Sequence, residues 1–102
     1  MSDSAEICRL DVWLWRARLS PTRTEAARII EKGRVRLTRA GQQARMSKAG
    51  YRVRPGDVVT LMRGERLVEA RIVAFGTRRG PPAEAAGLFE DLTRPAPETP
   101  DG

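Results

Sequence analysis

The sequence predicts a single α+β domain in which two short helices precede a set of strands and a short third helix. Its 102 residues suffice for one domain with a modest core. Apolar residues recur at helical spacing in the first third and alternate at strand spacing further on. We divide the chain into a flexible lead (1–8), a folded domain (9–92) and a disordered, Pro-rich acidic tail (93–102).

The first helix is predicted over residues 9–19. Its main apolar stripe follows the i, i+3, i+4, i+7 spacing of one helix face, at Leu10, Trp13, Leu14 and Ala17. Trp13 is therefore expected in the core. Trp15 lies on an offset stripe, where it packs against a sheet or stacks on a base.

The second helix is predicted to begin at Thr22, after the break at Ser20-Pro21. Thr22 and Glu25 have the spacing of a capping box, in which each side chain binds the other residue's free amide. Gly33 is expected to end this helix in a left-handed conformation.

Strands and turns make up most of the remaining prediction. Alternating or β-branched residues indicate strands, whereas Gly and Pro mark the turns between them. The expected elements are a strand at 34–38, a turn at 40–43, a loop with a short strand over 44–52, a tight turn at 54–57, strands at 58–62 and 67–75 around a turn at 63–66, and a helix at 83–92.

Positive charge is concentrated in the predicted domain. Residues 9–79 contain eighteen basic and six acidic side chains, whereas residues 80–102 have a net charge of −4. Seventeen of the nineteen cations are Arg, a ratio that either phosphate recognition or GC-rich codon usage explains. The net charge itself suggests a polyanionic partner.

Several classes of function find no support in the sequence. Cys8 is the only cysteine and there is no histidine, which leaves no metal cluster within the chain and no usual general base. We therefore expect no enzyme activity, no metal and no cofactor. No apolar run approaches the ~20 residues needed to span a bilayer, and the N-terminus does not resemble a secretory signal, so we expect a cytoplasmic protein without a membrane partner.

The candidate binding residues surround the second helix. A helix start exposes unpaired amides and a positive dipole end, which favour phosphate. Cations lie before this helix start, along the helix, and on the strand that comes next. On that strand they occupy the face opposite Val35 and Leu37. The alternative to a binding site is an ordinary solvent-exposed helix face, on which Arg and Lys are common. The candidate residues are Arg9, Arg16, Thr22, Arg23, Thr24, Arg28, Lys32, Gly33, Arg34, Arg36 and Lys48.

The runs RLDVWLWRARL, TRTEAA and GRV, in this order, resemble an S4-type RNA-binding domain. The Trp-rich first helix, RPGD and AEAAGLFE resemble in particular the heat shock protein 15 family. The resemblance implies an S4-like (alpha-L motif) fold, with two helices packed on a small, mostly antiparallel sheet. It also implies a basic groove that grips structured RNA, at Arg9, Arg16, Thr22, Arg23, Thr24, Arg28, Gly33, Arg34 and Lys48.

Family members associate with the large ribosomal subunit when a nascent chain remains attached, so the resemblance implies binding to large-subunit rRNA in rescue or recycling. Two departures are evident: Thr22 stands where Lys is usual, and an acidic stretch stands in place of a basic C-terminal extension. The alternatives are an accessory RNA-binding subunit of an RNA-modifying enzyme and a protein-interaction adaptor. DNA binding remains possible, and we expect a monomer when the protein is free.

Overall fold

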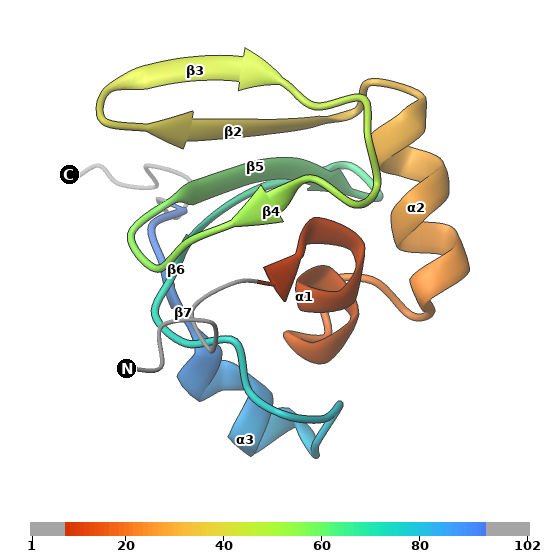
Figure 1. Ribbon diagram of the computed structural model, residues 1–102. Coiled ribbons are helices and arrows are strands. Elements are labelled where there is room, and N and C mark those ends of the chain that lie inside the picture. The colour runs from red at the N-terminus through yellow and green to blue at the C-terminus, as the bar shows by residue number, and fades with distance from the viewer. Residues whose placement is uncertain (1–7, 94–102) are drawn as a thin grey trace, which may run out of the picture.

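The computed structural model describes residues 8–93 of the chain. Two helices, α1 (Leu10–Arg16) and α2 (Arg23–Glu31), precede a five-stranded antiparallel sheet (Figure 1). The strands occur in the order β3 (Gln42–Arg45), β2 (Val35–Arg39), β5 (Val58–Arg63), β6 (Arg66–Ile72) and β7 (Phe89–Asp91). The predicted α+β architecture is thereby confirmed. The proposed lead at 1–7 and tail at 94–102 lie outside the described residues.

Three short elements complete the fold. Strand β1 (Cys8–Arg9) pairs antiparallel with β4 (Arg52–Val53), which attaches the start of α1 to the middle of the chain. Helix α3 (Pro82–Ala85) and a single 3-10 turn, η2 (Ala86–Leu88), lie between β6 and β7. Cys8, assigned by sequence to the lead, is therefore paired and buried.

The core lies between one face of the sheet and the two N-terminal helices. Every second residue of the central strands is buried, as the alternation of side chains across a strand requires. The strands contribute Val35, Leu37, Val59, Leu61, Ala70 and Ile72, and the helices contribute Leu10, Trp13, Leu14, Ala26 and Ile30.

Trp13 joins α1 to the far end of the sheet. Its side chain is fully buried, and its indole N–H donates a hydrogen bond to the Ala74 carbonyl oxygen at 3.0 Å. The ring meets Phe89 of β7 edge-on, with 6.3 Å between the ring centroids. The predicted core position of Trp13 is confirmed, whereas Trp15 is only half-buried.

Helix α1 is shorter than the predicted helix at 9–19. It ends at Arg16, and Arg18 takes a left-handed conformation with φ of 61°. The amides of Leu19 and Ser20 both donate to the Leu14 carbonyl oxygen, which closes the end of the helix. The chain thus turns towards α2 three residues earlier than the apolar pattern indicates.

The predicted helix at 83–92 is wrong in its second half. The helical turns end at Leu88, and Phe89 to Asp91 form strand β7, with Phe89 opposite Ile72 and Asp91 opposite Ala70. This strand satisfies backbone groups of β6 that would otherwise lie unpaired at the sheet edge. The same pairing brings Phe89 against Trp13.

The turn predicted at 40–43 contains only two residues, Ala40 and Gly41, so β3 begins at Gln42. Both turn residues have positive φ, at 53° and 79°, as a type I′ hairpin turn requires. Glycine adopts this conformation without steric cost, but Ala40 carries a Cβ atom and is strained there.

We expect the Ala40→Asn variant to be more stable than the parent by about 0.5–1 kcal/mol, because Asn-Gly is a preferred type I′ pair. Urea denaturation followed by tryptophan fluorescence measures this difference. Gly41→Ala in the same turn is the matched control and should destabilise the protein. Equal or lower stability of the Asn variant would contradict the turn geometry.

Candidate nucleic-acid interface

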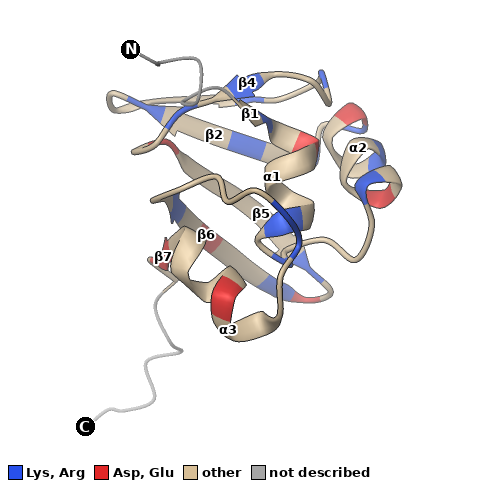
Figure 2. Ribbon diagram, turned by 60° about the horizontal axis from the view of Figure 1, so that its bottom comes forward, with Lys and Arg blue, Asp and Glu red and all other residues tan. Residues whose placement is uncertain are grey.

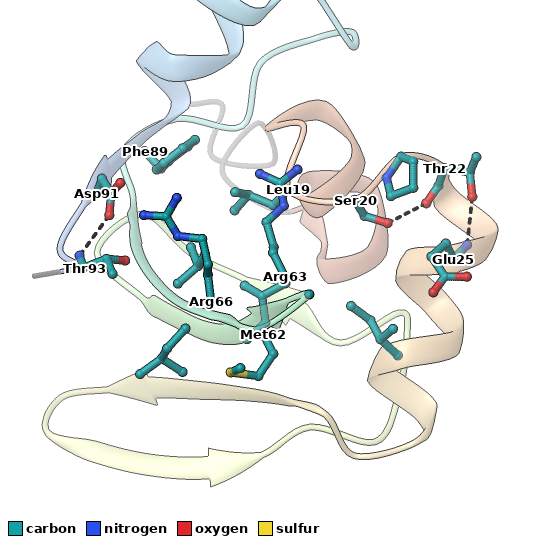
Figure 3. A pocket seen from close by; sticks show the side chains of 16 residues that line it. Leu19, Ser20, Thr22, Glu25, Met62, Arg63, Arg66, Phe89, Asp91 and Thr93 are labelled. Atoms are coloured by element: carbon teal, nitrogen blue, oxygen red, sulfur yellow. Dashed lines mark hydrogen bonds between the residues drawn. The ribbon is translucent and has the colours of Figure 1, made fainter. Parts of the chain in front are cut away.

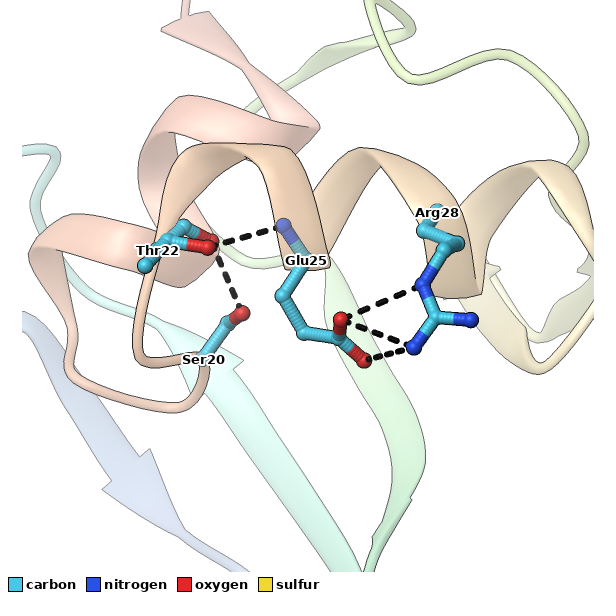
Figure 4. A network of polar contacts seen from close by, with 4 residues as sticks. All are labelled: Ser20, Thr22, Glu25 and Arg28. Atoms are coloured by element: carbon cyan, nitrogen blue, oxygen red, sulfur yellow. Dashed lines mark hydrogen bonds and ion pairs between the residues drawn. The ribbon is translucent and has the colours of Figure 1, made fainter.

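The start of α2 is held by a short polar network (Figure 4). The Thr22 hydroxyl accepts a hydrogen bond from the Glu25 amide at 2.9 Å, and the Ser20 hydroxyl donates to the Thr22 carbonyl oxygen at 3.0 Å. The Glu25 carboxylate turns along the helix and accepts from the Arg28 guanidinium. Only the Thr22 half of the predicted capping box is therefore formed among these side chains.

Two amides at this helix start have no acceptor within the helix. The first turn of an α-helix leaves its amides without intrahelical partners, and Thr22 satisfies only that of Glu25. The amides of Arg23 and Thr24 therefore remain available at the positive end of the helix dipole. The exposed side chains of both residues surround them with a guanidinium and a hydroxyl group.

The predicted left-handed stop at Gly33 is confirmed, with φ of 75°. The Gly33 amide donates to the Ile30 carbonyl oxygen and the Arg34 amide to that of Ile29, the two bonds of a Schellman motif. The side chain of Arg45 also lies directly over Gly33, because a Cβ atom built there would be 2.8 Å from the Arg45 Cδ atom. Gly33 thus both ends α2 and admits Arg45.

The predicted site residues differ in their surroundings. Most are exposed and make no side-chain contact with another described residue through a hydrogen bond or ion pair, namely Arg23, Thr24, Lys32, Arg34, Arg36 and Lys48. Arg28 forms an ion pair with Glu25. Arg9 precedes α1 and binds the buried Asp11 carboxylate through two hydrogen bonds, although its own side chain remains 53% exposed.

Arg16 is bound within the protein. It is half-buried, and its Nη1 atom donates to the Gly76 carbonyl oxygen at 2.9 Å. Arg16 is therefore less accessible than Arg9, which is exposed.

Arg16 belongs to a set of side-chain bonds that join residues 13–20 to residues 74–80. Arg18 Nε donates to the Gly80 carbonyl oxygen at 2.7 Å. In the opposite direction, Arg79 donates to the carbonyl oxygens of Trp15 and Ser20. These bonds fix the turn that leads into α2. Arg79 is not among the residues predicted from the sequence, since nothing in its local pattern indicates a partner about sixty residues away.

The charged residues are unevenly distributed over the elements (Figure 2). Strands β2 and β4 carry Arg and no acidic residue, α1 and α2 carry basic and acidic residues in equal number, and α3 and β7 carry acidic residues alone. Glu84 is paired with Arg78, and Glu90 with Arg71. The uninterrupted run of basic residues therefore begins at the end of α2, since residues 32–56 contain no Asp or Glu.

A groove opens between the α1–α2 turn and the β5–β6 hairpin (Figure 3). Leu19, Ile29, Leu61 and Phe89 provide apolar walls, and the side chains of Arg63 and Arg66 enter it from the sheet. It adjoins Thr22 and Glu25, so one side of the α2 start faces this groove.

Two features of the described residues bear on metal binding and on thiol reactivity. Within 8–93 there is no cluster of three or more His, Cys, Asp or Glu side chains that could hold a metal ion. Burial raises the pKa of the Cys8 thiol, an effect that Arg16 opposes and Asp11 reinforces, so this thiol keeps its proton at neutral pH. Among the helices of this part of the chain, none has the length and apolar character needed to cross a bilayer.

The S4 domain family model matches residues 8–37, the segment that contains α1, α2 and the beginning of β2. This match, together with the α+β fold, defines an S4-domain protein. The solved structure of heat shock protein 15 from Vibrio cholerae has a TM-score of 0.73 and 33% identity, covering 85% of this chain and 83% of that one. The chain belongs to the heat shock protein 15 family.

Curated relatives agree with this assignment. The Haemophilus influenzae heat shock protein 15 homolog is 36% identical over 83 residues, and heat shock protein 15 of Escherichia coli K12 is 37% identical over the same length. These matches cover 81% of this chain, and the chain spans about 60% of the length of these relatives. The solved structure of the Vibrio cholerae protein is a trimer.

We expect Thr22→Ala to lower the free energy of unfolding by about 1 kcal/mol, because the Glu25 amide loses its capping acceptor. Thermal or urea denaturation measures the loss. Thr24→Ala removes an exposed hydroxyl from the same helical turn and serves as the control, with a change of less than about 0.5 kcal/mol. Equal losses in the two variants would contradict the role of Thr22 as the cap.

Proposed function

We propose that this protein binds structured RNA through the helix–strand face, which we define as Thr22, Arg23, Thr24, Arg28, Lys32, Gly33, Arg34 and Arg36. The proposal rests on the two amides at the start of α2 that have no partner within the helix, and on the exposed cations of this face other than Arg28, which form no ion pair with a described acid. Phosphate oxygens accept hydrogen bonds from both amides and guanidinium groups.

The remaining predicted residues contribute to this proposal in different ways. Lys48 is exposed on the segment after β3 and is available to a phosphate. Arg9 lies beside Gly50 of the same segment, and its guanidinium keeps donors free while it binds Asp11. Arg16 acts by holding residue 76 and thereby the entry into α2, so we propose a positioning role for it.

RNA is favoured over DNA by the S4 domain match and by the resemblance of the RLDVWLWRARL and TRTEAA runs to S4-type RNA-binding domains. Phosphate contacts alone position a nucleic acid without distinguishing the two. An RNA-specific interface would add contacts to the 2′-hydroxyl groups, for which Thr22 and Thr24 offer hydroxyl partners.

Membership of the heat shock protein 15 family supports a finer proposal, namely that the RNA is large-subunit rRNA and that the protein acts on ribosomal subunits carrying a nascent chain. Such a role would place it in the cytoplasm. Crosslinking in cells followed by sequencing of the bound RNA tests this proposal. Reads concentrated on large-subunit rRNA would support it, whereas reads on tRNA or small-subunit rRNA would contradict it. A monomeric free state remains a prediction.

We expect the double variant Arg23→Gln/Lys32→Gln to bind a large-subunit rRNA fragment more weakly. Each lost phosphate contact should also reduce the slope of log affinity against log salt by about 1, hence by about 2 for both. Filter binding at a series of salt concentrations measures affinity and slope together. Arg71→Gln, on β6 and paired with Glu90, is the control that removes one charge elsewhere. An unchanged slope in the double variant would contradict the proposed face.

A further inference from the structure

The β2–β3 hairpin carries cations that no acid on either strand balances. Residues 32–56 contain eight Lys or Arg residues and no Asp or Glu. One of these cations, Arg39, is neutralised by the buried Asp57 carboxylate through hydrogen bonds at 2.9 and 2.8 Å. No comparable partner among residues 8–93 binds the side chains of Arg36 and Arg45, which are both exposed.

Arg36 and Arg45 face each other across the two strands. They are register partners in the antiparallel pairing of β2 with β3, so their side chains project from the same face of the hairpin. Val35 and Leu37, the neighbours of Arg36, are buried on the opposite face. Two like charges at directly opposed positions destabilise a sheet.

Arg45 and Arg36 belong to a row of cross-strand neighbours that runs across the sheet. The nearest acid in this row does not offset the repulsion between them. The row continues from Arg36 to Thr60 of β5 and then to Glu69 of β6. At a strand spacing of about 4.8 Å, the Glu69 backbone lies roughly 10 Å from that of Arg36 and roughly 14 Å from that of Arg45. The arginine pair is therefore left to the solvent or to an external anion.

Gly33 determines where Arg45 lies. The aliphatic part of the Arg45 side chain occupies the space that a Cβ atom at position 33 would fill, with a distance of 2.8 Å to Cδ. This contact directs Arg45 towards the end of α2, where Arg34 begins the approach to β2. Arg45 thus adjoins the helix–strand face, although it belongs to β3.

From this juxtaposition we propose that Arg36 and Arg45 form a phosphate clamp, in which two guanidinium groups bind one phosphodiester group of the RNA backbone. The proposal rests on the function proposed above and extends the helix–strand face onto β3. Guanidinium groups match phosphate oxygens through paired hydrogen bonds, and a bound phosphate relieves the repulsion between the two cations.

The test compares Arg45→Gln and Arg36→Gln/Arg45→Gln with the parent, using the rRNA fragment and the salt series described above. The salt slope should fall by about 1 and about 2, respectively. Thermal unfolding without RNA should occur at the same or a higher temperature, because the repulsion is removed. Arg63→Gln is a matched control, since Arg63 faces Arg66 across β5 and β6 but has Glu65 in its turn.

Binding of inorganic phosphate separates failure of the clamp from failure of the proposed function. We expect millimolar phosphate to shift the guanidinium NMR signals of Arg36 and Arg45 together, and to leave that of Arg63 unchanged. If phosphate causes these shifts but the parent protein does not bind RNA, the anion clamp is supported and the proposed RNA function is contradicted. If the parent and Arg45→Gln bind RNA with the same affinity and slope while Arg23→Gln/Lys32→Gln is weakened, the clamp is rejected and the RNA function stands.

Discussion

The buried Trp13 side chain fixes α1 against the sheet, and the positions of the surrounding surfaces depend on that contact. Its indole N–H would lose a hydrogen bond on burial if the Ala74 carbonyl oxygen were not there to accept it. Its ring also requires Phe89, which reaches it only because β7 pairs with β6. The segment between these strands is therefore part of the scaffold. Through Arg18 and Arg79 it then holds the turn from which α2 begins.

The arginines of this protein differ in what binds their guanidinium groups, and five of them pair with carboxylates. Arg16, Arg18 and Arg79 donate to backbone carbonyl oxygens and link distant segments. Such bonds satisfy buried acceptors without a counter-charge, which suits an interior with few acids. The arginines around the end of α2 have no such partner among the described residues. In the proposed interface their charge would bind phosphate, so the high Arg content would serve both the fold and RNA binding.

Much of this arrangement could be predicted from the sequence, because local rules dominate it. The helix start at Thr22, the stop at Gly33 and the core position of Trp13 follow from capping, glycine conformation and helical spacing. Contacts between distant segments could not be predicted in this way, and β7 was taken for helix because apolar spacing over so few residues fits both states. The pairing of Arg36 with Arg45 depends on turn length. A four-residue turn at 40–43 would place Ser47 opposite Arg36, whereas the two-residue turn places Arg45 there.

The central claim is that RNA binds at the start and the end of α2. Amide NMR spectra of the whole protein, recorded while a large-subunit rRNA fragment is added, test it most directly because they report on each residue separately. We expect the largest shifts at residues 22–24 and 33–36, with little change in α3 and β7. Shifts confined to α3, β7 and the groove near Arg63, with none at residues 22–24, would contradict it.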